Sequence, residues 1–214
     1  MIPALSLLDQ LDHLVYATPD LEATVTSLEQ LLGVRASEGG RHPGRGTRNA
    51  LMAIGPRSYL EIVGPDPAQH PFDHSTWFGI DDLPGPKLVT WAAKSSNLSD
   101  VVSAAERGGL KLGPITSGSR QRADGVTLTW QFTEPTFIQE DGILPFFIDW
   151  KSSSHPAANA AAGAELHSFF AEHPEPERVR GLLAALGLDL EVRSAPKPGL
   201  VAVLRTARGE FQLR

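Results

Sequence analysis

The 214-residue chain contains no cysteine, which excludes disulfide bonds, thiolate metal sites and cysteine nucleophiles. Positive charge is also scarce: 19 Lys and Arg against 25 Asp and Glu give a net charge of −6. A binding surface for nucleic acid or for an anionic membrane is therefore not expected. No apolar run approaches the roughly 18 residues of a membrane-spanning helix, and the N-terminal residues lack the pattern of a secretion signal. We expect a cytoplasmic protein.

Two common catalytic motifs are missing as well. No glycine-rich phosphate loop precedes a predicted helix, and no serine lies in a GxSxG turn. Hydrophobic residues make up 41% of the chain and charged residues 21%, which is typical of a globular protein with a substantial core.

Three segments of the chain share one pattern: a short apolar strand, a capped helix, a glycine and then further strands. The matched positions His13, Thr90 and Ser168 are 77 and then 78 residues apart. This spacing is too long for a solenoid repeat and suits a duplicated supersecondary module. Each segment is therefore predicted to be a β-α-β-β-β module, and duplicated modules of this kind usually form a cleft between them.

Hydrophobic alternation and helix caps predict the elements of each module. In the first they are strands 11–17, 34–38, 49–55 and 58–63 with helix 19–32; in the second, strands 88–94, 110–115, 126–133 and 144–150 with helix 97–107; in the third, strands 166–171, 188–193, 200–205 and 210–213 with helix 177–186.

The predicted fold class is α+β, with tandem modules (residues 10–65 and 87–151) forming a cleft-bearing mixed sheet. We predict a first domain at residues 1–156. The third, shorter module at the C-terminus, within residues 157–214, is predicted to pack on it. Residues 152–164 are predicted to be a linker, with a short alanine-rich helix as the alternative.

Several stretches between residues 10 and 156 carry a family resemblance: LDHLVYATPDL, GGRHPGRGTRNAL, YLEIVGPDP, GSRQRADG and LPFFIDW. Together they resemble the vicinal oxygen chelate superfamily, and more narrowly its glyoxalase-like domain proteins. The resemblance does not imply one activity. The superfamily hosts isomerases, ring-cleaving dioxygenases, thiol transferases, epimerases and metal-free antibiotic-binding proteins.

The resemblance implies a metal site with one ligand from the first strand and one from the fourth strand of each module. In the first module these positions match His13 and Glu61. Alternation along the strands places Glu61 on one face with Tyr59, and His13 on one face with Leu11 and Val15. A charge within an apolar strand needs a metal, a cation or hydrogen-bond donors as its partner.

In the second module the matched positions are Thr90 and either Phe147 or Asp149, which departs from the expected ligand pattern. A divalent ion held by His13 and Glu61 remains one interpretation, and Zn, Fe, Mn and Ni are not distinguished. The other interpretation is a buried His–Glu hydrogen bond that orders the sheet.

Two glycine-bearing hairpins carry basic and amide side chains in an otherwise acidic protein. These residues are Arg41, His42, Arg45, Arg48, Asn49, Arg120 and Arg122. Guanidinium groups suit the recognition of carboxylates or phosphates. We therefore predict that His42, Asn49 and Arg120 bind the ligand and that the cleft has a positively charged rim. Two solvated turns are the alternative.

Three tryptophans lie on predicted strands of the second module, and core packing is the common location for such residues. Trp130 and Trp150 are the predicted flat walls for an apolar or aromatic ligand, whereas Trp91 is expected in the core. The remaining histidines are expected outside the site: His70, His74 and His155 in exposed loops, and His167 and His173 in structural positions.

The predicted function is that of a glyoxalase-like enzyme acting on a small, anionic organic molecule, with Glu61 as general base or metal ligand. The alternative is a metal-free protein that sequesters a small apolar molecule. A third possibility is that residues 157–214 form a docking or dimer surface. We expect a monomer or homodimer whose partner is a small molecule, not nucleic acid or a membrane.

Overall fold

The computed structural model describes residues 7–69, 77–121, 125–135 and 139–214. The first part contains α1 (Leu7–Gln10), β1 (Leu11–Ala17), α2 (Leu21–Leu32), β2 (Ser37–His42), β3 (Thr47–Gly55) and β4 (Ser58–Pro65). The second contains β5 (Lys87–Lys94), α3 (Leu98–Arg107), β6 (Ile115–Gln121), β7 (Thr127–Thr133) and β8 (Phe146–Asp149). The third contains β9 (Ala164–His173), α4 (Pro176–Ala185), β10 (Val192–Ser194), β11 (Gly199–Thr206) and β12 (Gly209–Leu213). Four short 3₁₀ turns, η1 (Pro67–Gln69), η2 (Trp77–Asp82), η3 (Glu140–Gly142) and η4 (Pro156–Ala158), join them.

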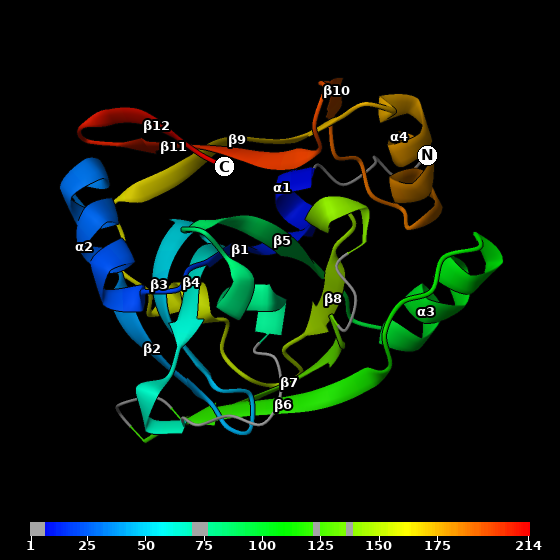
Figure 1. The fold of residues 1–214 in the computed structure, drawn as a ribbon. Coiled ribbons are helices and arrows are strands. Elements are labelled where there is room, and N and C mark those ends of the chain that lie inside the picture. The colour runs from blue at the N-terminus through cyan, green and yellow to red at the C-terminus, as the bar shows by residue number, and fades with distance from the viewer. Residues whose placement is uncertain (1–6, 70–76, 122–124, 136–138) are drawn as a thin grey trace.

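The first two modules form one eight-stranded sheet in the order β2-β3-β4-β1-β5-β8-β7-β6. Within each module the first and fourth strands are parallel, and the two modules join through the antiparallel pair β1 and β5. The edge strands β2 and β6 lie against each other, so the sheet curves until it is nearly closed (Figure 1). The predicted α+β fold and tandem modules are confirmed.

The third module has the predicted order of elements but a different strand pairing. Its sheet runs β10-β9-β11-β12, so the first strand pairs with the second and third strands and not with the fourth. Ser168, the position matched to His13, lies on β9, which β11 separates from the fourth strand β12. The third module therefore lacks the pairing of first and fourth strands that brings His13 and Glu61 together in the first. Hydrophobic alternation assigns side chains to faces, but it does not fix which strands pair.

The small sheet packs on the outer face of the large one, and a single hydrophobic core contains residues of both sheets (Figure 1). Trp91 lies in this core, as predicted; its Nε1 donates to the carbonyl of Ile143 at 2.8 Å, and its ring meets Phe169 edge to face. The domain boundary at residue 156 stays a prediction. None of the helices in the described ranges has the length and apolar character needed to span a membrane.

The inner face of the curved sheet has its own apolar lining, which includes Val15, Val63, Phe132, Phe146 and Ile148. This lining is separate from the core shared with the small sheet. The large sheet therefore buries side chains on both faces, and its inner face surrounds the candidate site.

Strand β6 is the main error in the predicted elements. It covers Ile115–Gln121 and not 110–115, because its sequence lacks the apolar alternation on which the prediction relied. A Cβ on Gly118 would lie 2.4 Å from the Trp130 ring, so the glycine leaves space for that indole. The predicted linker is also packed: it contains η4, and Ala53 N donates to Ala161 O at 2.8 Å. His70, His74 and Arg122 lie outside the described residues.

Candidate functional site

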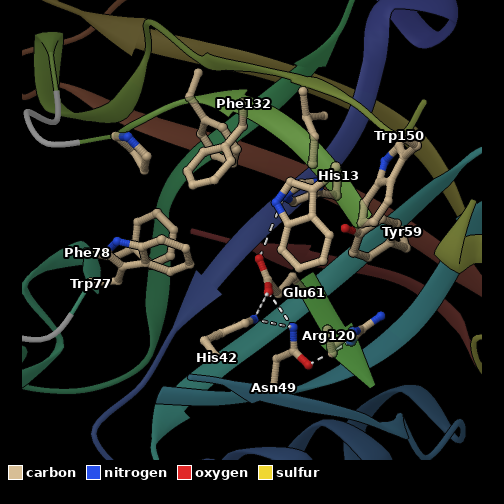
Figure 2. A pocket seen from close by; sticks show the side chains of 14 residues that line it. His13, His42, Asn49, Tyr59, Glu61, Trp77, Phe78, Arg120, Phe132 and Trp150 are labelled. Atoms are coloured by element: carbon tan, nitrogen blue, oxygen red, sulfur yellow. Dashed lines mark hydrogen bonds and ion pairs between the residues drawn. The ribbon is translucent and has the colours of Figure 1, made fainter. Parts of the chain in front are cut away.

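A small pocket lies inside the curved sheet (Figure 2). Its polar lining residues are His13, His42, Asn49, Glu61 and Arg120. Its aromatic walls include Tyr59, Trp77, Trp130, Phe132, Phe146 and Trp150. The space open to the centre of a water-sized sphere is about 40 Å³, which suits a few waters or one small chemical group. The structure thus brings every sequence-predicted site residue into one pocket, while their roles stay predictions.

His13 and Glu61 face each other from the neighbouring parallel strands β1 and β4. Their register places Tyr59 beside His13, and Tyr59 and Glu61 project into the pocket, as alternation predicted. His13 Nε2 is 3.6 Å from Glu61 Oε2, and both side chains are buried. The predicted closeness of these two groups is confirmed.

A second set of contacts holds Glu61 from the side of the β2–β3 hairpin (Figure 2). Asn49 Nδ2 donates to Glu61 Oε1 at 2.5 Å and lies 3.2 Å from His42 Nε2. Arg120 Nη1 donates to Asn49 Oδ1 at 3.1 Å, which links β6 of the second module to β3 of the first. His42 Nδ1 lies 2.9 Å from Thr47 Oγ1. Glu61 is thus held in one orientation by groups from three other strands.

His42, which was predicted to bind the ligand at the cleft, lines the pocket and is 6% exposed. The reason is that it ends β2 and points inward with the other pocket-facing residues of the sheet. The neighbouring arginines expected to add positive charge to the rim of the cleft are paired with carboxylates. Arg45 contacts Glu134 at 2.6 Å; Arg41 and Arg48 contact Asp66 and Glu22 at 3.7 and 3.1 Å. Arg120 is the arginine that lines the pocket.

Asp12 is a residue that the sequence interpretation missed. It is 1% exposed, and its Oδ1 lies 2.8 Å from His13 Nδ1. Neighbouring residues of a regular strand face opposite ways, but the β1–β5 register shifts between Leu11 and His13. This irregularity turns Leu11 into the core shared with the small sheet, which corrects its predicted face. An acidic residue directly before His13 in an apolar strand was the available signal.

His155 was expected in an exposed loop and is instead a partly buried partner of Asp12, with 11% of its side chain exposed. Its Nε2 lies 3.1 Å from Asp12 Oδ2, and its Nδ1 accepts a hydrogen bond from Ala157 N at 3.2 Å. Trp150 Nε1 donates to both Asp12 oxygens, at 3.2 and 3.1 Å. His155 is not in an exposed loop because residues 152–164 pack against the sheet. No local sequence pattern indicated this packing.

The surroundings of His42 and Asp12 determine whether these side chains are charged. Burial lowers the pKa of His42, and Arg120 and Arg45 lower it further, against the opposite effect of Glu61. Burial acts to raise the pKa of Asp12, but its hydrogen bonds with His13 and His155 outweigh it and hold the pKa below its usual range. At neutral pH we therefore infer that His42 is neutral and that Asp12 is ionised.

The lowered pKa of His42 predicts acid sensitivity. In the unfolded chain the His42 imidazole takes up a proton near pH 6.5, whereas in the folded chain it stays neutral to a lower pH. The contribution of His42 to the free energy of unfolding is therefore present above pH 6.5 and is lost as the pH falls below it. We expect the free energy of unfolding to fall between pH 7 and pH 5, by at most about 1.4 kcal/mol per pH unit. Urea unfolding of the wild type and His42→Gln should show a steeper fall for the wild type; parallel curves would contradict this prediction.

The strand register decides which residue of the second module corresponds to Glu61. Val15 lies opposite Glu61 in the first module. Because Thr90 matches His13, the counterpart of Val15 on β5 is Ala92, and Ala92 lies opposite Phe146. The counterpart of Glu61 is therefore Phe146, and not Phe147 or Asp149 as the sequence suggested. An apolar ring occupies the place of a second carboxylate ligand.

The described residues do not fit the divalent-metal site that the superfamily resemblance implies. The second module contributes Thr90 and Phe146, which are not a ligand pair. Within the described ranges, no group of three or more His, Cys, Asp or Glu side chains is arranged to hold a metal ion. In the first module, Asn49 already donates to one oxygen of Glu61. His13 and Glu61 therefore lie together without the further ligands that such a site would need.

Comparison with known proteins places this geometry in context. A family model described as "Glyoxalase-like domain" matches residues 11–187. A hypothetical protein from Staphylococcus aureus has 10% sequence identity and a TM-score of 0.68; the similarity covers 95% of this chain and 98% of that one. Methylmalonyl-CoA epimerase from Mycobacterium tuberculosis has 21% identity and a TM-score of 0.45, over 69% of this chain and 91% of its own. Among curated proteins, none matches the chain.

Proposed function

The chain belongs to the glyoxalase-like domain family, and we propose that it is an enzyme that transfers a proton on a small organic molecule, with Glu61 as general base. The observation that carries this proposal is the buried pair of His13 Nε2 and Glu61 Oε2, 3.6 Å apart in the pocket. A hydrogen bond orients each of the two side chains: Asp12 contacts His13, and Asn49 donates to Glu61. A carboxylate and an imidazole that face one space can remove a proton from a bound molecule and return it.

The pocket walls suggest the chemical class of the ligand. Aromatic side chains surround the space on several sides and suit an apolar body. Arg120 lines the same space, and a guanidinium group offers several N–H donors to a carboxylate or carbonyl oxygen. The proposed ligand is therefore a small molecule with an apolar part and an anionic or carbonyl group.

The aromatic walls also favour a second function, that of a protein which binds a small apolar molecule without chemical change. In that case Trp130 and Trp150, whose ring centroids are 5.2 Å apart, would provide the main contacts. The acid–base pair would then only order the pocket. The two functions differ in whether the bound molecule exchanges a proton.

Deuterium exchange tests the proposed enzyme. We expect the protein to catalyse exchange of the C–H next to the carbonyl group in at least one member of a panel of small keto acids, hydroxy acids and carboxylates in D₂O, monitored by NMR. The same compound should raise the melting temperature, since a ligand at 100 times its Kd adds about 2.7 kcal/mol of stability. Stabilisation by uncharged apolar compounds alone, with no exchange by any member, would contradict the enzyme and favour the binding protein.

A further inference from the structure

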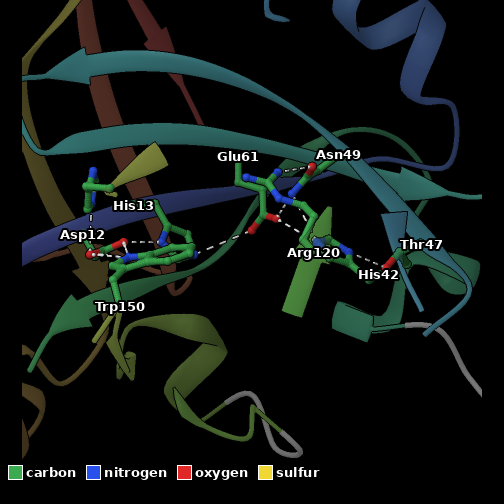
Figure 3. A network of polar contacts seen from close by, with 9 residues as sticks. Asp12, His13, His42, Thr47, Asn49, Glu61, Arg120 and Trp150 are labelled. Carbon is green, nitrogen blue, oxygen red and sulfur yellow. Dashed lines mark hydrogen bonds and ion pairs between the residues drawn. The ribbon is translucent and has the colours of Figure 1, made fainter. Parts of the chain in front are cut away.

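The carboxylate behind His13 is surrounded by hydrogen-bond donors (Figure 3). Asp12 Oδ1 contacts His13 Nδ1 at 2.8 Å and Trp150 Nε1 at 3.2 Å. Asp12 Oδ2 contacts His155 Nε2 at 3.1 Å and Trp150 Nε1 at 3.1 Å. The carboxylate is 1% exposed, so these three side chains are the contacts that compensate its burial in the described structure.

The direction of each hydrogen bond follows from the chemistry of the partners. An ionised carboxylate only accepts, and the indole Nε1–H of Trp150 only donates. His155 Nδ1 accepts from Ala157 N, so the proton of its neutral ring lies on Nε2, toward Asp12. His13 must likewise donate to Asp12, which places its proton on Nδ1.

We propose that Asp12, held by Trp150 and His155, is the positioning residue that fixes the proton of His13 on Nδ1 and turns its unprotonated Nε2 toward Glu61 and the ligand. The His13 ring is further oriented by Tyr59, which stacks on it with centroids 4.6 Å apart. Asp12 does not line the pocket and acts only through His13. Its catalytic consequence rests on the proposed acid–base function.

This arrangement also defines what the ligand presents to the pair. His13 Nε2 and Glu61 Oε2 are then two acceptors 3.6 Å apart. Two acceptors do not stabilise each other, but one O–H, N–H or acidic C–H group can lie within hydrogen-bond reach of both. The pair therefore selects a ligand group that carries a transferable proton, and the anionic or carbonyl oxygen of the ligand is left to Arg120.

The position of the proton on His13 can be measured without any substrate. We suggest long-range ¹H–¹⁵N correlation spectra of the full chain labelled with ¹⁵N-histidine, at pH 8.5, with the His13 signals assigned by their loss in His13→Gln. The expected result is a protonated Nδ1 and an unprotonated Nε2. An unprotonated Nδ1 of His13 in the wild type would overturn the proposal.

Asp12→Asn tests the role of the carboxylate with minimal change in shape. The asparagine NH₂ cannot take the place of Oδ2, because Ala157 N holds His155 as a donor toward that position, whereas Trp150 donates at both positions and does not distinguish them. It must therefore replace Oδ1 and donate to His13 Nδ1. We expect the His13 proton to move to Nε2. A folded Asp12→Asn protein whose His13 proton stays on Nδ1 would overturn the proposal.

Two further measurements separate positioning from general destabilisation. Asp66→Asn, which changes another buried carboxylate of the first module away from the pocket, should leave the His13 signals unchanged. In the exchange assay, Asp12→Asn should lower kcat at least 10-fold with little change in KM, because the ligand does not touch Asp12. If the wild type exchanges no compound, the proposed function fails, whereas the position of the His13 proton still decides the present inference.

Discussion

Glu61→Gln is expected to lower the rate of proton exchange by roughly 10²- to 10⁴-fold, the contribution typical of a general base. The amide keeps the size of the side chain and one oxygen acceptor, but it cannot take a proton from the ligand. The oxygen can still accept from Asn49, which donates to Glu61 Oε1 in the wild type. We therefore expect the fold and the affinity for the ligand to change much less than the rate. Exchange kinetics and thermal unfolding measure the two effects separately.

Asp66→Asn provides the matched control for this experiment. Asp66 is also a buried carboxylate close to β4, but it contacts Gln69 and the backbone of Ala68 outside the pocket. Its amide variant should exchange at nearly the wild-type rate. If Glu61→Gln kept the wild-type exchange rate but melted at a much lower temperature, Glu61 would be a structural residue and the proposed mechanism would be wrong.

Asp12→Ala is expected to reduce the free energy of unfolding by about 3–5 kcal/mol, an effect large enough to unfold a marginally stable domain. The substitution removes the shared acceptor of His13, Trp150 and His155 and leaves these donors without a carboxylate. Each buried donor that loses its partner costs roughly 1–3 kcal/mol, and partial relaxation or water entry reduces the sum. Urea unfolding at pH 7 measures this loss.

Glu210→Ala is the control for the loss of a carboxylate at the surface. Glu210 pairs with Arg205, but its side chain is 48% exposed, and such pairs contribute about 0–1 kcal/mol. We expect Asp12→Ala to be far more destabilising than Glu210→Ala. Equal losses in the two variants would show that the contacts of Asp12 do not hold this part of the pocket together.

The predictable parts of the structure are those in which apolar alternation is strong. Strand β4 has alternating faces, so Tyr59 and Glu61 were assigned together to the inner face while Leu60 and Ile62 pack in the core. Strand β6 has no such pattern. Its position depends on Gly118, which makes room for the Trp130 ring, and that is a contact between two strands and not a property of either one.

The pairing of strands was less predictable than their existence. The third module repeats the order of elements, yet β9 pairs with β10 and β11 and not with β12. The same limit applied to the counterpart of Glu61, which only the register of β5 and β8 identified as Phe146. Pairing is a choice among distant segments, so a local sequence window contains little information about it.

The sequence by itself determined the family, the two tandem modules and the inward direction of His13 and Glu61, because these depend on local periodicity and on recognisable motifs. Only the tertiary structure decided which side chains contact His13 on the side away from Glu61. The irregularity of β1 placed Asp12 beside His13, and the packing of residues after β8 brought His155 to the same carboxylate from 143 positions away. Those contacts depend on tertiary packing, because only the folded chain brings such distant side chains within hydrogen-bond distance.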